Sequence, residues 1–280
     1  MRKKYFNTIT GAGIMLALVT FASSCSKDST TNKTSTITVT PVTPVTPVAP
    51  VTYTLLWSDE FNGTAVDTTI WNMEKGSLGV NNEKEYYQAA NATVESGNLV
   101  ITAKKESVGG MPYTSARMNT LNKMSAKLGR VEARIKLPLG AGLWPAFWMM
   151  GTNINSVSWP TCGEIDIMEH VNADNIIYGT MHWNVNGHVQ YGLTTTTPTP
   201  DDYHIYAIDW DDSSIRWYID DTLYVTANIA NNINNTGAFH LPFFILLNMA
   251  VAGDFPGQTV DESKLPAKMY VDYVRVYKAN

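Results

Sequence analysis

Cysteine and charge are both scarce in this sequence of 280 residues. Its two cysteines cannot build a disulfide-rich scaffold or a four-cysteine zinc site. Charged residues make up 16% of the chain, against about 25% in typical soluble domains, and the formal charge is −5. Proteins that bind nucleic acid usually carry a basic surface, so this balance argues against a nucleic-acid partner.

Aromatic residues, by contrast, reach 11% of the chain, and apolar residues reach 44%. The apolar content is enough for a sizeable core, which excludes a wholly disordered chain. An aromatic surplus with few charges is typical of proteins that bind flat, uncharged ligands. A β-rich core also uses Tyr and Trp, so both interpretations stand at this point.

The apolar run near the N-terminus, residues 11–22, is too short for a comfortable span of a hydrocarbon layer of ~30 Å. It follows Arg2, Lys3 and Lys4, and it precedes two serines and Cys25, which is the order of a secretory signal. A Cys after small residues resembles a bacterial lipoprotein signal, so we predict a signal peptide at 1–24 and lipidation of Cys25. Ordinary cleavage nearby is the alternative. Removing three positive charges from a total of −5 gives −8 for the mature chain.

Residues 25–52 are predicted to form a tether, because they are rich in Ser, Thr, Val and Pro. Pro41, Pro44, Pro47 and Pro50 recur every third residue, which favours an extended polyproline II segment at ~3.1 Å per residue. A lipid, a tether and a domain in this order indicate an exported lipoprotein of the outer membrane or cell surface of a Gram-negative bacterium. We expect it to be a monomer anchored to the membrane through Cys25.

Residues 53–280 carry many short strand patterns and no long amphipathic helix. Residues 131–137 alternate apolar with charged side chains, residues 243–247 are continuously apolar as in a central strand, and two Asp-rich segments, 211–214 and 220–221, predict hairpin turns. Further strand patterns lie at 98–103, 204–210, 215–219 and 270–277. They predict a single all-β domain, a sandwich in which one sheet can curve into a groove for a polymeric ligand.

Three carboxylates lie close together in residues 163–170. In a regular strand Glu164 and Asp166 share one face, and Glu169 points to the other. A bulge at residues 167–168 would bring all three to one face, where two Glu side chains leaning together can reach the ~5–5.5 Å of a retaining glycosidase. Asp166 between them would raise the pKa of its neighbours. The alternative is a strand whose solvated face happens to be acidic.

The segment Glu164-Ile-Asp-Ile-Met-Glu169 resembles the signature of glycoside hydrolase family 16, in the bulged form of its laminarinase-like members. Further landmarks of that family follow in the same order through residues 53–280, at 57–62, 81–87, 142–149, 159–160, 179–183, 248–251 and 269–276. The resemblance implies a β-jelly-roll sandwich (concanavalin A-like) of two curved antiparallel sheets with a substrate cleft on the concave face.

By this resemblance Glu164 is the nucleophile, Glu169 the general acid/base and Asp166 the assisting carboxylate. The implied activity is that of a retaining endo-β-glucanase acting on β-1,3 or mixed β-1,3-1,4-glucans such as laminarin, lichenan or cereal β-glucan. No cofactor is needed for this chemistry. The alternatives are an agarase, porphyranase or carrageenase of the same fold, or a non-catalytic glucan-binding lipoprotein.

Sugar rings pack their C–H faces on tryptophan, and their hydroxyls need polar partners. Trp159 is expected to flank the cleft, and of Trp144 and Trp148 we expect one to form a platform and the other to anchor the core. The resemblance assigns sugar contacts to Asn82, Arg117 and His182. The alternative roles are a turn residue for Asn82, a surface charge for Arg117 and a packing residue for His182.

The resemblance breaks in the loop 250–257, where Ala252 replaces a glycine and Phe255 a tryptophan, which puts one sugar subsite in doubt. The family also implies a structural calcium ion, which would be held mostly by backbone oxygens at Glu60, Gly97 and Asp272. The five histidines show no zinc-ligand spacing. Cys162 is expected to be a buried, unpaired thiol.

Overall fold

The computed structural model describes residues 51–280. The predicted signal peptide, Cys25 and all but the last two residues of the predicted tether lie outside the described residues. Within the described part of the chain, no helix is long and apolar enough to cross a membrane.

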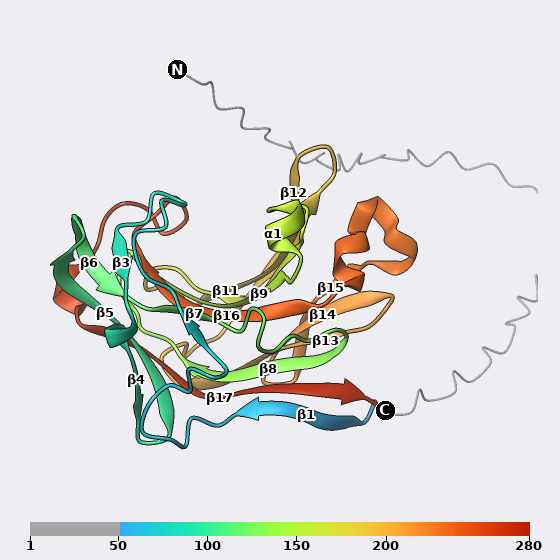
Figure 1. Ribbon diagram of the computed structural model, residues 1–280, viewed down its shortest axis with the longest axis horizontal. Coiled ribbons are helices and arrows are strands. Elements are labelled where there is room, and N and C mark those ends of the chain that lie inside the picture. Colours follow the sequence, from blue (N-terminus) through green and yellow to red (C-terminus); the bar gives the residue numbers. More distant parts are fainter. Residues whose placement is uncertain (1–50) are drawn as a thin grey trace, which may run out of the picture. The chain divides into compact units, whose positions relative to one another are not determined.

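Two sheets stack on each other (Figure 1). The seven-stranded sheet has the order β12 (His188–Thr196), β11 (Ile176–Asn184), β10 (Glu164–Glu169), β9 (Leu143–Gly151), β16 (Phe243–Val251), β7 (Arg117–Asn119), β2 (Asn72–Met73). The ten-stranded sheet has the order β15 (Thr222–Asn228), β14 (Ser214–Ile219), β13 (Tyr203–Trp210), β8 (Gly129–Lys136), β17 (Ala267–Ala279), β5 (Asn98–Val108), β6 (Met111–Ser115), β3 (Glu85–Tyr87), with β1 (Tyr53–Asp59) on β17 and β4 (Ala92–Glu95) on β5.

Helical segments in the described residues are short: α1 (Ile154–Val157), η1 (Ala89–Asn91), η2 (Ala230–His240) and η3 (Glu262–Lys264). The strand pairs are antiparallel apart from β3 and β6, which run parallel. Figure 1 shows the seven-stranded sheet bowed, with its edge strand β12 and the helix α1 rising at one side and β3 and β6 of the ten-stranded sheet at the other. The predicted all-β sandwich is confirmed.

The main core lies between the two sheets, because strand alternation sends one face of each strand inward. On β8, Val131 and Ile135 are fully buried, while Arg130 and Arg134 on the other face are partly exposed. The predicted central strand is β16, which is buried along its whole length. The predicted turns connect β13 to β14 and β14 to β15.

A second, smaller apolar cluster lies on the opposite face of the seven-stranded sheet and consists of Ala146, Trp148, Met150, Cys162, Phe244 and Leu246. Both faces of β9 and β16 are therefore apolar, which explains why their sequences show no polar alternation. Cys162 is buried and unpaired, as predicted, and burial raises the pKa of its thiol to about 11.

Candidate active site

The catalytic strand β10 contains the predicted bulge. Glu164, Asp166 and Glu169 lie opposite His182, Thr180 and Tyr178 of β11, so three residues of β10 span the same length as two of β11 after Asp166. The register against β9 shifts at the same place. The extra residue restores the phase of the strand, and all three carboxylates line one groove.

The bulge is held from the opposite sheet. The indole N–H of Trp217 on β14 donates a hydrogen bond of 2.8 Å to the main-chain oxygen of Asp166. Trp217 is fully buried, and Ile167 and Met168 of the bulge are buried in the main core. Gly163 precedes the strand with φ +80°, in the left-handed region that favours glycine, and a Cβ there would come within 2.9 Å of the Phe243 ring.

Trp217→Phe is expected to lower the free energy of unfolding by about 2 kcal/mol or more, because it leaves a buried carbonyl unpaired and opens a cavity. Activity measured below the melting temperature should fall as well, because the bulge loses its support. Trp210→Phe is the matched control, since Trp210 is also buried and donates 2.9 Å to the main-chain oxygen of Phe239, away from the bulge. Equal activity loss in the two variants, measured at matched folded fraction, would contradict this role of Trp217.

Burial dominates the electrostatics of the three carboxylates. Burial raises the pKa of Asp166 to about 8, and burial together with the neighbouring Asp166 raises the pKa of Glu164 and of Glu169 to about 8. Two neighbours act in the opposite direction and lower the pKa of the glutamates. His182 Nε2 lies 4.0 Å from Glu164 Oε1 and 3.0 Å from Asp166 Oδ2. The indole N–H of Trp144 donates a hydrogen bond of 2.8 Å to Glu169 Oε1. The group is poised to exchange protons near neutral pH.

Among the described residues, one set of His, Cys, Asp and Glu side chains brings three potential metal-ligating atoms within 4.8 Å of one another, and it consists of Glu164, Asp166 and His182. His182 Nε2 lies 3.0 Å from Asp166 Oδ2, but Oδ2 has no hydrogen-bond partner among the described residues. The raised pKa values of the three carboxyls assign the set to proton chemistry.

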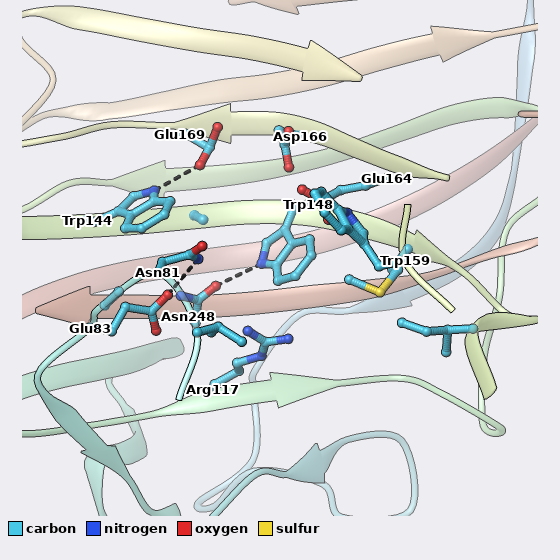
Figure 2. Close-up of a pocket in the computed structure, with 15 residues that line it drawn as sticks. Asn81, Glu83, Arg117, Trp144, Trp148, Trp159, Glu164, Asp166, Glu169 and Asn248 are labelled. Atoms are coloured by element: carbon cyan, nitrogen blue, oxygen red, sulfur yellow. Dashed lines mark hydrogen bonds between the residues drawn. The ribbon is translucent and has the colours of Figure 1, made fainter. Parts of the chain in front are cut away.

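The groove has a volume of about 500 Å³, and Figure 2 shows the three tryptophans around the carboxylates. Trp159 is 44% exposed at one side, and Trp144 and Trp148 both line the groove from β9. As expected, one of the two is a core anchor: Trp148 is 9% exposed within the second apolar cluster, and its N–H is bonded to Asn248 Oδ1 at 2.8 Å. Trp144 is only partly buried and forms the platform.

The predicted polar residues take different positions. Arg117 lines the groove, stacks over Trp148 at 4.8 Å and pairs with Glu74 at 3.1 Å. His182 contacts the carboxylates from β11. The side chain of Asn82 does not line the groove and donates 2.8 Å to Asp254 Oδ1, which ties two loops together.

Several groove residues had no predicted role in sugar binding: Asn81, Glu83, Asn248, Val80, Met150, Ile154, Ala146 and Ala250. Figure 2 shows Asn81 beside Glu83, to which it donates 2.9 Å, with Asn248 below Trp148. Asn81 and Asn248 stand in segments that resemble the family, and that signal was available in the sequence. The apolar residues come from β9, β16, α1 and the loop before β3, which only the fold brings together.

Residues 80–275 match the model of glycosyl hydrolases family 16. The chain belongs to this family. An X-ray structure of the laminarinase from Rhodothermus marinus matches the fold with a TM-score of 0.77 at 39% identity, covering 82% of this chain and 99% of that one. The jelly-roll fold and the laminarinase-like family resemblance predicted from the sequence are thereby confirmed.

Two further relatives differ in how much of their own length aligns with this chain. The clotting factor G alpha subunit of Tachypleus tridentatus is 43% identical over 234 residues, which are 81% of this chain but 34% of that protein. The chain therefore spans about a third of this relative. A keratan-sulfate endo-1,4-beta-galactosidase of Sphingobacterium multivorum is 36% identical over 294 residues, covering 99% of this chain and 68% of that protein.

The loop after β16, where the sequence departs from family 16, lies against the groove. Ala252 is fully buried with φ +59°, a conformation that usually favours glycine. Phe255, 39% exposed, packs edge-on against Trp144 and Tyr178 at centroid distances of 5.4 and 4.9 Å. Phe255 thus supports the tryptophan that bonds Glu169.

A buried carboxyl holds the start of this loop. Glu85, 2% exposed, accepts 2.7 Å from the main-chain N–H of Val251, and burial together with the nearby Glu83 raises the pKa of Glu85 to about 8.

Because this folded-state pKa lies above the ordinary 4.5, the folded chain holds a proton that the unfolded chain has lost, and stability falls as pH rises between these values. Glu85→Gln keeps an acceptor for Val251 without a charge. We expect the melting temperature of this variant to fall less than that of the wild type between pH 5 and 9. At the alkaline end its free energy of unfolding should exceed that of the wild type by about 1–2 kcal/mol. Glu95→Gln is the control, since Glu95 is exposed and its pKa is lowered. If the melting temperature of Glu85→Gln fell with pH as steeply as that of the wild type, Glu85 would not be the group that causes the fall.

At the predicted calcium site, the carboxylates of Glu60 and Asp272 are both paired with arginines. Both oxygens of Glu60 accept from Arg275 at 2.9 and 2.8 Å, and Asp272 pairs with Arg134 at 2.7 Å. These carboxylates are committed to arginine and do not fit as calcium ligands. An ion held by main-chain oxygens at Glu60, Gly97 and Asp272 stays a prediction.

Proposed function

We propose that this chain is a retaining endo-β-glucanase that hydrolyses β-1,3 or mixed β-1,3-1,4-glucans. The observation that carries the proposal is the bulged trio Glu164, Asp166 and Glu169 on the floor of a tryptophan-lined groove. Buried carboxyls with raised pKa values beside aromatic platforms are what glycoside hydrolysis requires.

In the first step Glu169 donates its proton to the glycosidic oxygen while Glu164 attacks the anomeric carbon. The aglycone leaves as an alcohol, and a covalent glycosyl-enzyme forms. Trp144 orients Glu169 through its N–H, and Asp166 raises the pKa of Glu169 so that it keeps a proton to give. In the second step Glu169, now a base, takes a proton from water, which attacks the same carbon and releases the sugar with retained configuration.

The charges of the groove favour a neutral substrate. Its lining contains Glu83 and the three carboxylates of β10 against one cation, Arg117, which is itself paired with Glu74. The β10 carboxyls lose their protons as pH rises through about 8, so the groove then becomes more negative and disfavours a sulfated chain, whereas a glucan carries no charge.

A second candidate is an endo-β-galactosidase. It is favoured by the alignment with the keratan-sulfate endo-1,4-beta-galactosidase, which extends over 99% of this chain. The groove charges disfavour its sulfated substrates but not an unsulfated galactan.

Product analysis on laminarin, lichenan and barley β-glucan, with keratan sulfate and agarose in parallel, decides between the candidates. We expect new reducing ends and short oligosaccharides from the glucans, with the β-anomer appearing first by NMR. Cleavage of the galactans alone would replace the proposal with the second candidate. Binding of glucan without any cleavage would establish a non-catalytic carrier.

Export and anchoring through Cys25 are part of the same proposal and are supported by the N-terminal sequence alone. Expressed in a Gram-negative host, the chain should incorporate a labelled fatty acid and fractionate with membranes. Cys25→Ser should release it in soluble form, and an unlabelled wild-type chain would contradict the anchor.

A further inference from the structure

His188 lies next to the catalytic group without touching the carboxylates. It opens β12, opposite Asn184 across a tight hairpin from β11, and its side chain is exposed. Its Nε2 lies 2.8 Å from Nδ1 of His182, and the two rings stack with centroids 5.1 Å apart. Trp159 also packs against His188, with the two ring centroids 4.7 Å apart.

The two short contacts of His182 constrain its protons. A 2.8 Å contact between two ring nitrogens needs one proton between them, so either His188 or His182 donates. If His188 donates, neutral His182 accepts at Nδ1 and carries its own proton on Nε2. That nitrogen lies 3.0 Å from Asp166 Oδ2 and can then donate to an ionised carboxylate. If His182 donates instead, a bare Nε2 faces Asp166, which must then be protonated.

We propose that His188 is a positioning residue for catalysis: its Nε2–H holds His182 in the Nε2–H tautomer, so that His182 can donate to Asp166 and favours the ionised form of Asp166. This inference rests on the proposed function, because it assigns Asp166 a role in that reaction. Asp166 Oδ2 is buried and has no hydrogen-bond partner among the described residues, and His182 Nε2 lies 3.0 Å from it, so a small turn of the His182 ring would supply the donor that this oxygen lacks.

The charge of Asp166 reaches both glutamates. After burial, Asp166 is the next largest cause that raises the pKa of Glu164 and of Glu169. Besides Asp166 and His188, the titratable groups that interact with His182 are Glu164 and Glu169, and His182 lowers the pKa of both. Burial and His182 lower the pKa of His188, which leaves it neutral and able to donate from one nitrogen.

Loss of His188 should therefore shift the whole pH profile of activity to lower pH. When His182 can change tautomer and Asp166 takes up a proton, the pKa values of Glu164 and Glu169 both fall. In His188→Phe, which keeps a ring against Trp159 but has no donor, we expect both limbs of the kcat/KM profile to shift to lower pH by roughly half a unit or more, with a several-fold lower kcat near pH 7 and little change in KM.

Two comparisons test the donor specifically. His188→Gln retains an N–H that can reach His182 and should restore most of the profile that His188→Phe loses. Tyr191→Phe is the control on the same strand, because Tyr191 lies beside Met181 on the opposite face of the sheet. An unshifted profile in His188→Phe, or equal shifts in the Gln and Phe variants, would overturn the proposal.

NMR of chain labelled with ¹⁵N-histidine supplies a readout that does not need activity. With five histidines in the sequence, the ring signals can be assigned by single substitutions. Wild type should show His182 protonated on Nε2 and bare on Nδ1, and His188→Phe should change this pattern. His182 protonated on Nδ1 in the wild type would overturn the inference. An inactive chain with the expected tautomers would instead refute the proposed function.

Discussion

Replacing Glu164 with glutamine is expected to lower kcat on β-glucan by about 10⁴-fold or more, because an amide of nearly the same shape cannot attack the anomeric carbon. Glucan affinity should remain, since the groove tryptophans and Arg117 are untouched. Glu95→Gln, an exposed carboxylate on the other sheet, should keep full activity. Reducing-end release and affinity electrophoresis with the same glucan measure the two properties.

The role of Glu164 can be separated from a structural one by chemical rescue. In Glu164→Gly the space of the carboxylate is free, and azide can enter it to attack an activated aryl β-glucoside from the same side. The expected product is the α-glycosyl azide, formed with a single inversion. A β-azide from this variant would assign Glu164 to the acid/base position instead.

Replacing Glu169 with glutamine has the second largest expected effect, and its size depends on the leaving group. Glucan needs a proton at the departing oxygen, so kcat/KM on glucan should fall by about 10²–10⁴-fold. An aryl glucoside with an acidic phenol leaves without that proton, so its first step should be nearly preserved and the glycosyl-enzyme should accumulate. A burst of phenol followed by slow turnover is the measurement.

The pH profile and azide again distinguish the roles. Burial and the nearby Asp166 raise the pKa of Glu169 to about 8. Wild-type activity should therefore fall at high pH, where Glu169 loses its proton. Glu169→Gln should lack this alkaline limb on the aryl substrate. Azide should accelerate Glu169→Gly and give the β-glycosyl azide. An alkaline limb that survives in the variant would show that another group is the acid.

The bulge in β10 was predictable because its cause is local. Glu169 stands at odd spacing from Glu164 and Asp166, and an unpaired carboxylate facing the core is too costly, so one extra residue must be accommodated. The strands followed from period-two alternation in the same way, and β16 from its unbroken apolar run. The family followed from residue types in order along the chain and was confirmed.

The walls of the groove were less predictable, because they come from segments far apart in the sequence. Asn82 was predicted to reach sugar but bonds Asp254, 172 residues away, while its neighbour Asn81 lines the groove. Trp144 and Trp148 were predicted to divide between platform and core anchor, but alternation could not say which was which. Trp148 is the one buried, in a second apolar cluster beneath the groove.

By itself, the sequence determined the strands, the bulge, the three carboxylates and the family, because each depends on neighbouring residues and their spacing. Only the tertiary structure decided which partners tune those carboxylates. Trp217 reaches Asp166 from the other sheet, and His188 reaches His182 across a hairpin. Hydrogen bonds of 2.8 Å between such residues depend on sheet packing and curvature, which no local pattern encodes.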